Sequence, residues 1–106
     1  MTAVWDEAKR QANLLKHGLD FAEFETAFDG EDAVYLPAQP SRTGRIRYKI
    51  IGRWRDRLVV VVIVSPLGAE AIALVSLRYA NPKERAVHDR LGSQDRRAGI
   101  FPGGLG

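Results

Sequence analysis

The stretch that decides the fold is RIRYKIIGRWRDRLVVVVIV, residues 45–64. Its first part alternates between basic and apolar residues, as a half-buried strand does. The basic face would carry Arg45, Arg47 and Lys49, and the apolar face Ile46, Tyr48 and Ile50. Trp54 to Asp56 predicts a hairpin tip. Leu58 to Val64 predicts a second strand, which belongs in the centre of a sheet because it is apolar on both faces.

Elements on either side of this hairpin follow from capping residues and periodicity. Val4 to His17 predicts a helix with Asp6 as N-cap and Gly18 as C-terminal stop. A second helix would begin at Asp20 and end at Asp29-Gly30. The first helix would have an apolar stripe of Ala8, Ala12 and Leu15. The second would have a stripe of Phe21, Phe24 and Phe28. Further strands are expected at Ala33 to Leu36 and at Glu70 to Tyr79. One face of the second of these strands would carry Ile72, Leu74, Ser76 and Arg78. A short helix would follow from Pro82 to about Leu91, with Asn81 as its N-cap.

This order of elements predicts an α+β fold. Two N-terminal helices and a short C-terminal helix would pack on one face of an antiparallel sheet of about four strands. Residues 1–91 would form a single domain, and residues 92–106, with five glycines, a flexible tail.

The composition excludes several classes of protein. The chain has 106 residues, 45% of them hydrophobic and 27% charged, which is typical of a globular domain. It has no cysteine, so disulfide scaffolds and zinc-thiolate folds are excluded. No apolar run is long enough to span a membrane, and the acidic Asp6 and Glu7 argue against a signal peptide. We therefore expect a cytoplasmic protein.

The basic residues are mostly arginine and are concentrated in one segment. Of the 16 basic residues 12 are arginine, which binds phosphate through a planar fork of donors, although a GC-rich genome produces the same bias. Residues 42–57 are strongly basic, whereas residues 17–36 are acidic apart from His17. With Arg78 and Arg53 added, the basic strand face predicts an anion-binding surface. The alternative is an edge strand that charge protects from aggregation.

Few side chains could transfer protons. His17 ends the first helix and is either a general acid or base or a C-capping residue. His88 is expected on the solvated surface. The two histidines are not at metal-ligand spacing, and no phosphate-binding loop is present, so no metal or cofactor is expected.

The opening string Trp5-Asp6-x-x-Lys9-x-x-x-Asn13-x-x-Lys16-His17-Gly18 resembles the start of the BrnT toxin family. The resemblance continues through Arg47-Tyr48, Ile51-Gly52, the valine strand and Ser76-Leu77-Arg78-Tyr79-Ala80, over about residues 3 to 90. Families of this kind commonly have two basic residues before the alanine, whereas here the second is Tyr79.

The resemblance implies a RelE/ParE-like fold and a metal-independent ribonuclease toxin of a type II toxin–antitoxin system. Its partner would be a BrnA-like antitoxin with a ribbon-helix-helix region, in a heterotetramer that reaches operator DNA only through the antitoxin. Two alternatives stay open: a non-catalytic nucleic-acid-binding module and a ParE-like toxin that acts on gyrase.

Candidate residues were assigned to roles in RNA cleavage. Arg78 and Arg47 would stabilise the phosphorane, and His17 and Tyr79 would carry protons. Glu84 is a possible base, although capping of the last helix explains it better. RNA-binding residues would be Arg45, Lys49, Arg53, Lys16 and Arg85.

Overall fold

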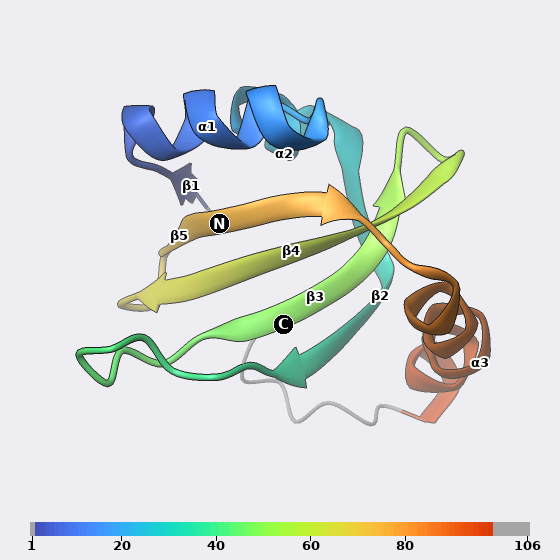
Figure 1. The fold of residues 1–106 in the computed structure, drawn as a ribbon. Coiled ribbons are helices and arrows are strands. Elements are labelled where there is room, and N and C mark those ends of the chain that lie inside the picture. Colours follow the sequence, from blue (N-terminus) through green and yellow to red (C-terminus); the bar gives the residue numbers. More distant parts are fainter. Residues whose placement is uncertain (1, 99–106) are drawn as a thin grey trace.

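The structure, a computed structural model, describes residues 2–98 and the side chains of residues 2–92. A five-stranded sheet of order β1-β5-β4-β3-β2 has helices on both faces (Figure 1). In chain order the elements are β1 (Thr2–Val4), α1 (Glu7–His17), the 3-10 turn η1 (Phe21–Glu23), α2 (Phe24–Ala27), β2 (Phe28–Pro37), β3 (Tyr48–Trp54), β4 (Leu58–Leu67), β5 (Ala71–Tyr79) and α3 (Pro82–Ala98). The sheet is mixed, because β1 pairs parallel to β5, and not the predicted antiparallel sheet of about four strands. No helix in this part of the chain is long and apolar enough to cross a membrane.

The predicted hairpin is confirmed, with β4 at the centre of the sheet. Arg55 and Asp56 form its tip with positive φ angles of 54° and 60°, as in the type I′ turn that matches strand twist. The predicted start at Arg45 is wrong, because β3 begins at Tyr48. Ile46, expected to be buried, is 62% exposed.

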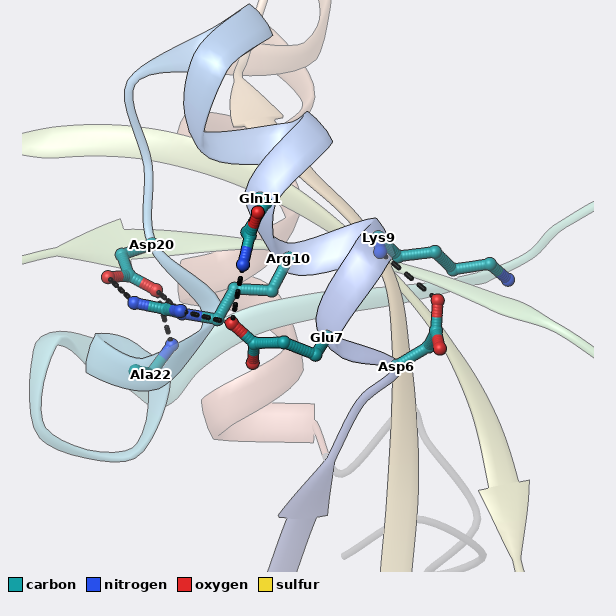
Figure 2. Close-up of polar contacts among 7 residues, drawn as sticks. All are labelled: Asp6, Glu7, Lys9, Arg10, Gln11, Asp20 and Ala22. Atoms are coloured by element: carbon teal, nitrogen blue, oxygen red, sulfur yellow. Dashed lines mark hydrogen bonds and ion pairs between the residues drawn. The ribbon is translucent and has the colours of Figure 1, made fainter.

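Both capping residues of α1 are as predicted, but the helix does not begin at the predicted Val4. Asp6 accepts a hydrogen bond from the Lys9 amide at 3.1 Å, as an N-cap does (Figure 2). At the other end Gly18 adopts the left-handed conformation, with φ 74°. The helix begins after Asp6 because residues 2–4 pair with β5 instead of extending it.

The face of α1 that packs on the sheet is not the predicted apolar stripe. Leu15 is 91% exposed, and Ala8 and Ala12 are exposed as well. Asn13 is buried instead: its Nδ2 donates to the Leu77 carbonyl at 2.8 Å, and its Oδ1 accepts from the Leu77 amide at 3.0 Å. Since β1 pairs only with residues 71–73, this side chain takes the place of a neighbouring strand further along β5.

The second predicted helix is shorter than expected. Asp20 caps it, accepting from the Ala22 amide at 2.9 Å, and binds Arg10 of α1 (Figure 2). One 3-10 turn and one α-helical turn follow, and Phe28 already begins β2. Its ring stacks on Phe24 with centroids 4.9 Å apart. The strand therefore starts before the predicted Ala33 and pairs irregularly with β3 between Asp29 and Val34.

A bulge in β5 changes which of its residues share a face. The register with β4 shifts between Ile63 and Val64. Leu74 and Leu77, three residues apart, therefore lie in the same core under α1 and α2. The prediction that Arg78 shares a face with Leu74 is wrong, because Arg78 lies on the opposite face, beside its partner Val61.

That opposite face is covered in part by α3, so the prediction of helices on one face only is wrong. Val87 and Leu91 pack on Val34, Ile51 and Val61. The helix runs to Ala98, beyond the predicted end near Leu91, so the first part of the expected tail is helical. The rest, residues 99–106, lies outside the described residues. His88, expected at the surface, is only 7% exposed.

Candidate nucleic-acid interface

α3 covers one end of the sheet face opposite α1 and α2, and the described helices leave the rest of that face open (Figure 1). Lys49 of β3, Ile63 of β4 and Ser76 of β5 form a cross-strand row there, and all three are half-buried. Arg78 lies on the same face, in the row of Val61. The pairing of three strands thus brings Lys49 and Arg78 to one surface.

A single carboxylate connects these two cations. Glu84, in the first turn of α3, accepts from Arg78 Nη1 and Nη2 at 2.8 Å each, in a bidentate pair. Lys49 Nζ lies 2.6 Å from Glu84 Oε2. The predicted capping box is also confirmed, since Glu84 Oε1 accepts from the Asn81 amide at 3.0 Å and Asn81 Oδ1 accepts from the Glu84 amide at 2.8 Å.

These contacts shift the pKa values of Glu84 and Arg78. Hydrogen bonds from Arg78 hold the pKa of Glu84 far below its usual range, and Lys49 and the Asn81 amide act in the same direction although burial opposes them. The same pairing raises the pKa of Arg78. Glu84 is therefore an anion at neutral pH and a very weak base, which favours its structural role over proton abstraction.

Arg47 adds a third cation. It directly precedes β3 and is half-buried, with a buried Nε that has no hydrogen-bond partner among the described residues. Arg45 lies further out in the loop and is exposed. The Arg47 carbonyl accepts from the Ala38 amide at 3.1 Å, so pairing with the segment after β2 continues through Arg47, and strand alternation favours the face of Lys49 for its side chain. Lys49 and Arg78 alone already outnumber the carboxylate of Glu84 that they share.

Carboxylates of the protein pair with several cations of the predicted anion-binding surface. Besides the Glu84 pairs, Arg53 binds Asp32 at 2.8 Å and Asp29 at 3.4 Å. It lines a pocket of about 200 Å³ with His88 of α3. The structure thus places Arg53 under α3 and does not bring it to Lys49 and Arg78.

His17 lies at the end of α1, close to the β5 edge. With Lys9, Lys16 and Ser76 it lines a shallow pocket of about 240 Å³. Burial lowers the pKa of His17, and the charges of Lys16 and Arg78 lower it further. At neutral pH the imidazole is therefore neutral and able to accept a proton.

Two predicted residues are not part of this cluster. Tyr79 pairs with Val60, which faces the core under α1 and α2, so it lies on the opposite face of β5 from Arg78. Arg85 is exposed on the first turn of α3, where its Nη1 donates to the Ala80 carbonyl at 3.0 Å.

Sequence reasoning missed two features of this site. It assigned Glu84 to the helix cap and missed its ion pairs, although a glutamate six residues after Arg78 was the available signal. It also missed Lys9, whose spacing of seven from Lys16 puts both on one side of α1.

A larger cavity of about 690 Å³ opens on the opposite face, lined by Phe24, Phe28, Tyr35 and Ile50 among others, without a basic side chain. Among the described residues, no three His, Cys, Asp or Glu side chains are grouped to hold a metal ion.

Comparison with known proteins decides the family. Residues 5–84 match the family described as the ribonuclease toxin, BrnT, of type II toxin–antitoxin systems. The chain belongs to the BrnT family. It is 36% identical to the Brucella abortus ribonuclease toxin BrnT, whose crystal structure it matches with a TM-score of 0.62 over 76% of this chain and 99% of the other. A search of curated proteins gives no match.

The BrnT resemblance predicted from the sequence is therefore confirmed. The matched region contains α1, the whole sheet except β1, and the first turn of α3 with Glu84. Membership of a type II toxin–antitoxin family implies an antitoxin as partner.

Proposed function

We propose that this BrnT-family protein is a metal-independent endoribonuclease that acts at the open sheet face around Arg78. The observation that carries the proposal is that β3 and β5 bring Lys49 and Arg78 to one partly exposed surface, where these two cations share the carboxylate of Glu84 and Arg47 lies two residues before Lys49. Fixed cations stabilise the charge that develops on a phosphorane without the reorganisation that water would need. The family's description as a ribonuclease supports RNA as the substrate.

The cleavage step uses the RNA's own nucleophile. The ribose 2′-hydroxyl attacks the adjacent phosphorus and the bond from phosphorus to the 5′-oxygen breaks. The leaving 5′-oxygen takes a proton from water, and the products are a 2′,3′-cyclic phosphate and a 5′-hydroxyl. His17 takes the 2′ proton, which its lowered pKa allows at neutral pH. Arg78 and Arg47 hold the non-bridging oxygens, since arginine stays charged and cannot act as the base.

The remaining cations extend the binding path. Arg45 continues it beyond Arg47 at one end, and Lys16 continues it beside His17 at the other. Each contact to a phosphate contributes affinity that does not depend on sequence and that weakens as salt is added.

The antitoxin is proposed to be a BrnA-like protein with a ribbon-helix-helix region. Two toxins and two antitoxins would form the complex, in the cytoplasm, and operator DNA would be contacted only by the antitoxin. We also propose that the fold belongs to the RelE/ParE-like group, which its α+β layout supports. We expect the neighbouring gene to encode a small DNA-binding protein that co-purifies with this chain. The mass of the complex should fit two copies of each chain. Absence of such a protein would contradict this assignment.

The activity is tested by incubating the purified protein with single-stranded RNA in EDTA. We expect cleavage with cyclic phosphate ends, and no cleavage of a DNA oligonucleotide of the same sequence because it lacks the 2′-hydroxyl. Bound but intact RNA would favour a non-catalytic binding module. Inhibition of gyrase supercoiling with no loss of RNA would favour the ParE-like alternative. Cleavage that stops in EDTA and returns with added metal would overturn metal independence.

A further inference from the structure

We propose that Glu84 is a positioning residue for the cleavage reaction: its carboxylate fixes Arg78 and Lys49 in the geometry that receives the scissile phosphate. This inference rests on the proposed function and deepens it. The residue itself does not touch RNA, since its side chain is only 9% exposed.

The carboxylate is held from behind by the backbone. Oε1 accepts from the Asn81 amide at 3.0 Å, so Glu84 is fixed to the first turn of α3. That helix in turn packs on Val34, Ile51 and Val61 of the sheet. Glu84 is therefore anchored to the same rigid sheet that carries the cations.

The two cations converge on this anchor from separate strands. Arg78 of β5 donates to it with both Nη atoms at 2.8 Å, and Lys49 of β3 contacts Oε2 at 2.6 Å. Long basic side chains otherwise sample many rotamers, and ordering them has an entropic cost that RNA binding would have to meet. Glu84 orders them before RNA arrives, which is the preorganisation that transition-state stabilisation requires.

Enough donors remain for a phosphate. An arginine has five N–H donors. Two of those of Arg78 go to Glu84, and one Nη1 contact of 3.3 Å reaches the Tyr79 carbonyl. Nε–H and one Nη2–H of Arg78 are left, and Lys49 keeps two of its three donors. Both side chains are about one third exposed, 34% for Arg78 and 29% for Lys49.

The experiment is the substitution Glu84→Gln, because glutamine also satisfies a capping box but removes the charge that holds the cations. We expect the single-turnover cleavage rate at saturating RNA to fall by about tenfold to a hundredfold, the range that a small misplacement of a reacting group causes. We expect the affinity for a non-cleavable 2′-deoxy oligonucleotide to stay equal or to increase by about threefold to tenfold, since one negative charge is lost next to the phosphate.

The control is Asp20→Ala, which removes the cap of η1 and the ion pair with Arg10 without touching Glu84 or the cations. It should lower the melting temperature and leave the rate at saturating RNA unchanged. A purely structural role of Glu84 would lower rate and affinity together, and Asp20→Ala would do the same. That result, or a Glu84→Gln protein that cuts at the wild-type rate, would overturn the inference.

RNA cleavage by the wild-type protein, measured beside the variant, keeps the two proposals distinguishable. If the wild-type protein cuts no RNA, the proposed function fails. If the wild type cuts and Glu84→Gln cuts equally well, only the positioning role fails. Circular dichroism of each variant confirms that the folded protein is being compared.

Discussion

The stability of the fold should depend on Asn13 and hardly at all on Leu15, the reverse of what the helical pattern of α1 predicts. The Asn13 amide forms three buried hydrogen bonds, to the amide and carbonyl of Leu77 and to the carbonyl of Leu19. Asn13→Ala leaves these three backbone groups without a partner. At about 1–2 kcal/mol each, reduced by water that enters at the sheet edge, the expected loss is about 3–4 kcal/mol.

Leu15→Ala provides the matched control on the same helix. Its side chain is 91% exposed, so the free energy of unfolding should change by less than about 0.5 kcal/mol. Were Leu15 in the core, the loss would be about 2–5 kcal/mol. Urea denaturation followed by circular dichroism measures both variants. A loss below about 1 kcal/mol for Asn13→Ala, or a larger loss for Leu15→Ala, would refute the argument that an amide replaces the missing strand.

Three further results are expected. Gly52→Ala should cost about 1–3 kcal/mol, because a Cβ there would lie 2.5 Å from the Phe28 ring, whereas Gly30→Ala, with no neighbour closer than 3.9 Å, should cost little; urea midpoints of the two variants test this. The pKa of Glu84 is lower in the folded than in the unfolded protein, so its contribution to the free energy of unfolding is complete above about pH 5 and is lost as the pH falls. Urea midpoints measured down to about pH 3 should therefore decline more in the wild type than in Glu84→Gln. Equal declines would refute the pairing. Because the pKa of His17 is lowered, the cleavage rate should stay constant as the pH is lowered to about 6.5 and should fall only at lower pH. A rate that already falls with decreasing pH above about 6.5 would exclude His17 as the base.

The hairpin and the central strand could be predicted because their signals are local. Alternation, a short charged segment between two strands and a run that is apolar on both faces are all properties of neighbouring residues. The caps Asp6 and Asn81 were predictable for the same reason, since each acts within three residues of the chain.

The remaining features depend on contacts between distant residues. The burial of Asn13 depends on the unpaired edge of β5, 64 positions away, which no helical period reveals. The bulge in β5 and the parallel pairing of β1 likewise arise from strand partners. The cations of the site could be predicted from the sequence. The Glu84 pairs could not, because β3, β5 and α3 come together only in the folded chain.

The central claim is that Arg78 and the neighbouring cations of the open sheet face promote RNA cleavage. The most direct test compares Arg78→Ala with Arg55→Ala. Arg55 is also an exposed arginine paired with a glutamate, Glu23 at 2.8 Å, but it lies at the hairpin tip. With single-turnover cleavage measured in EDTA, we predict that Arg78→Ala lowers the rate by about 10²–10³ and that Arg55→Ala leaves it unchanged. Equal rates in the two variants would contradict the account.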